Sequence, residues 1–98
     1  MSTLTIERRL ATVQQVIITV DSLEIDLSDG RSVSAPMAWY PRLLHATQEE
    51  RDHWRLIGGG EAIHWPDIDE DISVESVLAG RPSGESQHSL QKWIATRS

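Results

Sequence analysis

Apolar and polar residues alternate in three consecutive stretches near the start of the chain. Residues 13–20 are rich in Val, Ile and Thr, which favour strands. In residues 23–27, Leu and Ile alternate strictly with Glu and Asp, as in a strand with one buried face. Asp29-Gly30 is typical of a hairpin turn, and the alternation resumes in residues 31–35. These patterns predict a three-stranded antiparallel meander.

The middle of the chain carries signals for helices. Residues 37–45 are apolar on one side, with Pro41 in the first turn, where proline is tolerated. Thr47 and Glu50 have the spacing of a capping box, so we expect a helix that begins at Thr47 and continues through residue 55. Three glycines at residues 58–60 are expected to end that helix.

One further strand is expected after the glycines. Residues 62–65 predict a short strand that Pro66 ends, and acidic residues then lead into a short helix over residues 74–79. Together the elements predict an α+β fold. Its sheet is small and antiparallel, a three-stranded meander plus one later short strand, with helices packed on one side.

The two ends of the chain differ from this central part. Residues 1–11 are expected to form a flexible arm, and residues 12–80 the α+β domain. Residues 81–87 are rich in Pro, Ser and Gly and predict a linker. Within residues 81–98, a short amphipathic helix is expected to follow, with Leu90, Trp93 and Ile94 on one face.

Composition limits the classes of function. The chain has 98 residues, enough for one domain, and no cysteine, which excludes disulfides and thiolate metal sites. Nine basic residues face fifteen acidic ones, and a net charge of −6 opposes nucleic-acid binding by the chain alone. The longest apolar run, residues 16–18, is too short to span a membrane, and no secretion signal is evident. We therefore expect a cytoplasmic protein that does not bind membranes.

An acidic cluster invites a metal-site interpretation that the spacing does not support. Asp67, Asp69 and Asp71 begin like a calcium-binding loop. Ile72 then stands where that loop needs glycine, and Leu78 where it needs a bidentate glutamate. Carboxylates that favour the N-terminus of the following helix are the better interpretation.

Other chemistries also lack a supporting motif. His64 has no second histidine at a metal-binding spacing, and we expect it to hydrogen-bond a carboxylate or carbonyl instead. The glycines at residues 58–60 lack the Lys-Ser/Thr of a phosphate-binding loop, and no serine occupies a nucleophile elbow. We therefore expect no catalytic residues, no metal, no cofactor and no enzymatic activity.

Two groups of aromatic and apolar residues are candidates for partner binding. Trp39, Tyr40 and Arg42 are residue types enriched at the centres of interfaces, although Trp39 could equally belong to the core. The second group is the face of the C-terminal helix, with Leu90, Trp93 and Ile94. That helix either folds back on its own domain or docks in a groove of a partner.

Several of these motifs in order resemble one bacterial family, the domain of unknown function 2442. The motifs are Asp29-Gly30-Arg31, Trp39-Tyr40-Pro41-Arg42-Leu43, Glu49-Glu50-Arg51, Trp54-Arg55-Leu56-Ile57-Gly58, Ile63-His64-Trp65-Pro66, Asp69-Glu70-Asp71-Ile72-Ser73-Val74-Glu75, Leu78 and Gly80. The resemblance covers residues 12–80, with Ala62 where the family often has glycine. It implies a small α+β fold, no established catalytic residues and, from members encoded beside small toxin-like proteins, an antitoxin-like role.

The leading functional hypothesis is a non-enzymatic, antitoxin-like protein that binds a small basic protein partner. An acidic surface would suit such a partner. One alternative is a small-ligand sensor with a pocket lined by Trp39, Trp54, Trp65 and His64. Another is an acidic inhibitor from a phage or mobile element that mimics nucleic acid. A homodimer formed through a sheet edge or the tail also remains open.

The stretch from residue 63 to residue 74 gives a specific expectation about burial. Ile63, Trp65, Ile72 and Val74 are predicted to be buried in the core. Asp67, Asp69 and Glu70 are predicted to be mostly solvated.

Overall fold

A computed structural model describes residues 11–97 of the chain. The predicted N-terminal arm, residues 1–11, lies outside the described residues except for Ala11, which packs against the core. The first sheet is the predicted meander, with β1 (Val13–Ile18), β2 (Ser22–Leu27) and β3 (Ser32–Pro36) antiparallel in that order. The alternation in β2 is confirmed, because Leu23, Ile25 and Leu27 are buried and the acids between them are only half-buried.

A second three-stranded antiparallel sheet replaces the single later strand that was predicted. It consists of β4 (Arg55–Ile57), β5 (Ala62–Trp65) and β6 (Glu70–Ser73), in that order. The prediction of a helix through residue 55 is wrong, since α3 (Gln48–Asp52) is a single turn and β4 follows it.

The glycines explain this error. Gly58 and Gly59 have φ of 62° and 70°, and the Gly60 N–H donates to the Ile57 carbonyl at 3.1 Å. Gly58 and Gly59 begin the four-residue loop 58–61, which joins Ile57 of β4 to its cross-strand partner Ala62 of β5. The glycines therefore reverse a strand rather than end a helix.

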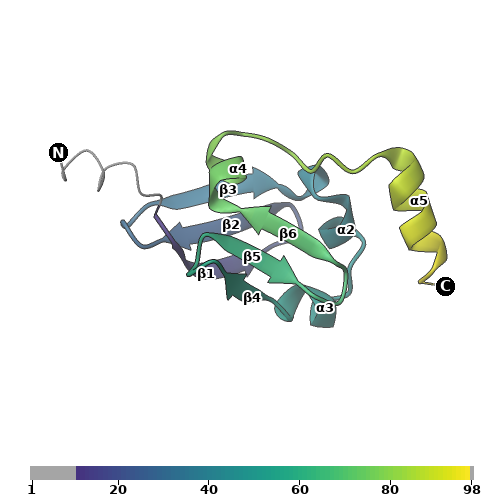
Figure 1. The fold of residues 1–98 in the computed structure, drawn as a ribbon, viewed down its shortest axis with the longest axis horizontal. Coiled ribbons are helices and arrows are strands. Elements are labelled where there is room, and N and C mark those ends of the chain that lie inside the picture. Colours follow the sequence, from purple (N-terminus) through teal and green to yellow (C-terminus); the bar gives the residue numbers. More distant parts are fainter. Residues whose placement is uncertain (1–10, 98) are drawn as a thin grey trace.

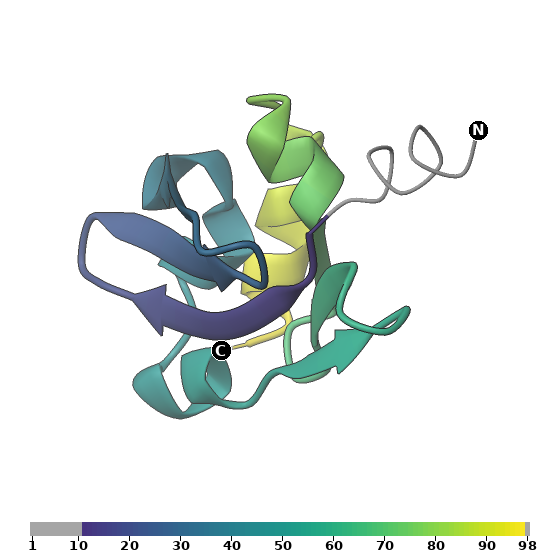
Figure 2. The ribbon, with the colours of Figure 1, turned by 90° about the vertical axis from the view of Figure 1, so that its left-hand side faces the viewer.

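The helices occupy several places around the sheets (Figures 1 and 2). The 3-10 turn η1 (Met37–Trp39) and α2 (Pro41–Leu44) lead into α3, whose capping box between Thr47 and Glu50 is confirmed. The helix α4 (Val74–Leu78) lies near β3 and β6, and α5 (Gln87–Ala95) lies at the opposite end of the molecule. The prediction that the helices pack on one side is therefore wrong.

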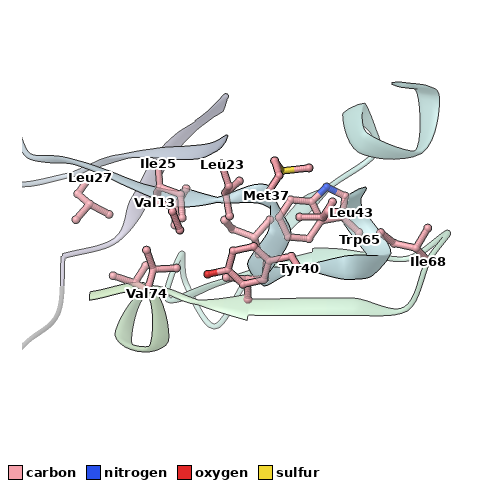
Figure 3. Packing of buried hydrophobic residues seen from close by; sticks show 14 residues of the cluster. Val13, Leu23, Ile25, Leu27, Met37, Tyr40, Leu43, Trp65, Ile68 and Val74 are labelled. Carbon is pink, nitrogen blue, oxygen red and sulfur yellow. The ribbon is translucent and has the colours of Figure 1, made fainter. Parts of the chain in front are cut away.

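The core lies between the two sheets, where side chains of β2 such as Leu23 and Ile25 approach Trp65 of the second sheet and Val74 of α4 (Figure 3). The predicted burial of four residues is confirmed, since none of them is more than 2% exposed to solvent. These residues are Ile63, Trp65, Ile72 and Val74. Trp65 also donates from Nε1 to the carbonyl of Arg51 at 3.1 Å. This bond satisfies the polar end of the largest core side chain.

Gly60 joins the two sheets at one corner. The Val13 N–H donates to the Gly60 carbonyl at 2.8 Å. Gly60 has φ of 99°, and a Cβ there would lie 2.9 Å from the Cβ of Thr12. Only glycine allows the backbone of the second sheet to approach β1 this closely.

Candidate functional site

The C-terminal helix is held on its own domain by a partly buried ion pair, Arg42–Glu85, whose acid lies just before the helix. The Arg42 guanidinium donates to both oxygens of Glu85, with a shortest distance of 2.7 Å, and to the Ile68 carbonyl at 2.9 Å. Glu85 also accepts from the Ser89 hydroxyl at 2.8 Å. These bonds hold the pKa of Glu85 below its usual value, with Arg42 as the largest cause. Arg42 is thus committed to an intramolecular role in this structure.

Trp93 of α5 lies between two guanidinium groups. Its ring centre is 5.1 Å from the Arg42 guanidinium carbon and 4.5 Å from that of Arg97. Arg97 in turn pairs with Glu50 at 2.6 Å and, through these hydrogen bonds, lowers the pKa of that carboxyl to about 2. Leu90 is 8% exposed and Ile94 is half-buried. Of the two interpretations of the tail, the structure shows the one in which α5 folds back.

The other two predicted partner-binding residues lie where the chain enters η1 and α2. Trp39 is half-buried against the core, and its carbonyl accepts from the Ser83 N–H at 2.9 Å. Tyr40 is 2% exposed. The structure therefore brings Arg42 and Trp93 into contact, whereas the Tyr40 side chain lies in the interior.

Two of the four histidines, His53 and His64, each pair with one carboxylate. His64 of β5 contacts Asp71, its cross-strand neighbour on β6, as expected for a histidine that bonds a carboxylate. His53 lies 2.8 Å from Asp67. Among residues 11–97 no three His, Asp or Glu side chains gather in a way that would hold a metal ion.

A cavity of about 450 Å³ opens beside β6 and the start of α4, and we refer to it as the Tyr40–Glu70 cavity. Besides these two residues, its lining includes Ser73, Ser76 and Arg81. The Tyr40 hydroxyl and Glu70 Oε2 are both buried and have no hydrogen-bond partner within residues 11–97. Trp39, Trp54, Trp65 and His64 do not line this cavity, so it is a different site from the pocket considered among those four residues.

The partial burial of Glu70 corrects the expectation that it is mostly solvated. Its residue is half-buried, and desolvation is the largest cause of a pKa raised to about 7. Burial and the nearby Glu70 charge also raise the pKa of Tyr40. The sequence held a signal for this placement, because in a strand Glu70 shares a face with the buried Ile72 two residues on.

The strand β4 has an open outer edge and carries two exposed aliphatic side chains. β4 pairs only with β5 in the described sheet, which leaves its other edge open. Leu56 and Ile57 are 39% and 36% exposed. The exposed carboxylates of Asp52 and Glu61 lie just before and just after this hairpin strand. We call Leu56, Ile57, Asp52 and Glu61 the β4 edge surface.

Comparison with known proteins identifies the family of this chain. The model of a family described as protein of unknown function (DUF2442) matches residues 13–83. The chain belongs to this family. The match confirms the resemblance read from the motifs, and it includes all of the second sheet and every residue that lines the Tyr40–Glu70 cavity except Gly84.

Two solved structures share the DUF2442 fold seen here. One is a crystal structure of a protein of unknown function from Rhodospirillum rubrum, at 18% identity and a TM-score of 0.66, covering 81% of this chain and 98% of that one. The other is a solution structure of an uncharacterized protein from Chromobacterium violaceum, at 20% identity and a TM-score of 0.64, covering 98% and 83%. No curated protein matches the sequence. No helix in the part of the chain that the structure describes is long and apolar enough to cross a membrane.

Proposed function

We propose that this DUF2442 protein is a non-enzymatic binding protein whose partner is a small basic protein. The observation that carries the proposal is the β4 edge surface, an open strand edge with two exposed aliphatic side chains and exposed carboxylates in the segments that flank the strand. Free N–H and C=O groups along such an edge pair readily with an added strand.

Charge favours a basic partner over a second copy of this chain. The chain carries a net charge of −6, so two copies repel each other, whereas a cationic segment is attracted. Asp52 and Glu61, which flank β4 in the sequence, are both exposed and would attract a cationic segment. The gene-neighbour pattern implied by the family resemblance makes an antitoxin-like role the specific form of this proposal.

The α5 face is a weaker candidate for the same partner. Leu90 is nearly covered, and Trp93 is occupied by Arg42 and Arg97. A partner that used this face would first have to displace these contacts and the Arg97–Glu50 pair. The β4 edge surface needs no such rearrangement.

Co-expression with the product of the adjacent gene, followed by affinity purification, tests the proposal. We expect a complex that weakens as salt is added, since screening reduces the attraction between exposed charges. Leu56→Lys and Ile57→Lys should abolish it by placing positive charge on the edge. Leu78→Lys is the matched control, because Leu78 is 37% exposed but lies on α4.

Two results would count against this function. The first is the absence of any complex with the neighbouring product. The second is a complex that survives both β4 substitutions or that Leu78→Lys weakens equally.

A further inference from the structure

The Tyr40–Glu70 cavity has the size and setting of a small-molecule site. Its volume of about 450 Å³ lies within the range usual for ligand pockets, about 300–1,000 Å³. Its walls come from β6, the start of α4 and residues 81–84, which lead toward α5. Figure 3 shows the Tyr40 hydroxyl pointing away from Trp65 and Ile68, toward the side where Val74 begins α4.

Two polar atoms in this cavity have no partner among residues 11–97. They are the hydroxyl of Tyr40, a residue that is 2% exposed, and Glu70 Oε2. Buried polar atoms in proteins are nearly always hydrogen-bonded, and exceptions call for an explanation. A bound group that donates hydrogen bonds would satisfy both atoms.

The charged side chains nearby do not supply that donor. Arg42 interacts with Glu70 through charge, but its guanidinium is occupied by Glu85 and the Ile68 carbonyl. Asp71 is paired with His64. The negative charge of Glu70 is therefore complemented best by a cation from outside the chain.

Arg81 adds the opposite charge to the same cavity. It is exposed, it lines the cavity, and it takes part in none of the ion pairs of the described residues. Its backbone is fixed by a hydrogen bond from its N–H to the Ser76 carbonyl at 2.9 Å. A guanidinium in this position suits a carboxylate, which it binds with two parallel hydrogen bonds.

We propose that the Tyr40–Glu70 cavity binds a small zwitterion of the amino-acid class, with its ammonium group at Glu70 and Tyr40 and its carboxylate at Arg81. The ammonium donates to Glu70 Oε2 and to the Tyr40 hydroxyl oxygen. The raised pKa of Glu70 agrees with a carboxylate that lacks a counter-ion in the free protein. This site is separate from the β4 edge surface and does not depend on the proposed partner.

The full-length chain offers a single-site reporter for a test, because Tyr40 is its only tyrosine. NMR signals of the Tyr40 ring are followed while each standard free amino acid is added at millimolar concentration. For each amino acid that binds, the matched alkylamine without the carboxylate and the matched carboxylic acid without the ammonium are added in parallel. We expect saturable shifts with at least one amino acid and weaker binding of both analogues.

Three substitutions separate the contributing groups. Glu70→Gln and Arg81→Gln should each weaken binding about tenfold or more. Each substitution removes the charge that strengthens the hydrogen bonds to the oppositely charged group of the ligand. Tyr40→Phe should weaken it less, with backbone amide signals of residues 70–76 as the reporter. Glu49→Gln, an exposed carboxylate outside both the cavity lining and the β4 edge surface, should leave the affinity unchanged.

The proposal is overturned if no amino acid shifts the Tyr40 signals, or if Glu70→Gln binds as well as the native chain. It is also overturned if the carboxylic acid alone binds as tightly as the amino acid, because Glu70 then has no role. Loss of the β4 complex in the Leu56→Lys variant leaves these titrations unaffected.

Discussion

Replacing Glu70 with glutamine should stabilise the protein increasingly as the pH rises above about 4.5, with the full effect at neutral and higher pH. Burial raises the pKa of Glu70 from 4.5 in the unfolded chain to about 7 in the fold. One pKa unit corresponds to about 1.4 kcal/mol, so a shift of this size corresponds to about 3.5 kcal/mol. Because Glu70 is only half-buried, solvent screening reduces the penalty of the ionised carboxylate to about 2–3 kcal/mol. Glutamine keeps the size of the side chain and removes the charge.

The direction of the pH dependence follows from the raised pKa. Below about pH 4 the carboxyl is protonated in both the folded and the unfolded state, so it contributes no penalty. As the pH rises from about 4.5 to about 7, the unfolded chain ionises first and the native protein loses stability. Above that range the loss stays constant.

Urea denaturation of the native chain and the Glu70→Gln variant at about pH 4 and about pH 8 measures this effect. We expect the two free energies of unfolding to agree at the lower pH and to differ by about 2–3 kcal/mol at the higher pH. Glu61→Gln, an exposed carboxylate, should show little change at either pH. A Glu70→Gln variant that is less stable than the native chain at the higher pH would refute the reasoning.

Three further substitutions test the fold. Trp65→Ala should lower the free energy of unfolding by about 3–5 kcal/mol, because the side chain is fully buried, and a loss below about 1 kcal/mol in chemical denaturation would contradict its place in the core. Gly60→Ala should be more destabilising than Gly59→Ala in thermal denaturation, since both residues have positive φ but only Gly60 contacts Thr12; equal losses would disprove the close approach. Arg42→Lys should speed hydrogen exchange in α5 selectively, because lysine cannot form the two-pronged bond to Glu85, and unchanged exchange there would show that Arg42 does not anchor the helix.

The first sheet was predictable because its signals are local. The alternation in β2 and the Asp29-Gly30 turn lie within one hairpin, and burial follows directly from the period of two. The capping box between Thr47 and Glu50 is equally local, since both of its hydrogen bonds join residues three apart.

The second sheet was missed because its strands are short and their signals conflict. Arg55–Ile57 directly follows a genuine helix start, and three residues are too few to show a strand period. Gly58 and Gly59 are compatible with a helix end and with a hairpin turn, and only pairing with β5 distinguishes the two. Because β6 was not predicted, the inward direction of the Glu70 side chain was not predicted either.

The Tyr40–Glu70 cavity was invisible to motif reasoning for a related reason. Its residues come from a helix entry, a strand and a linker, and no fixed spacing connects them. The sequence therefore predicts that Asp67, Asp69 and Glu70 are all mostly solvated. In the fold, Asp69 is exposed while Glu70 Oε2 is buried.

Hydrogen exchange of the complex with the basic partner tests the central functional claim most directly. The account predicts that adding the partner slows exchange in β4 (Arg55–Ile57) at the backbone amides that point away from β5. An added strand would accept hydrogen bonds from these amides. Exchange in β3, at the far edge of the other sheet, should stay unchanged. Slower exchange confined to α5, with β4 unaffected, would contradict the claim.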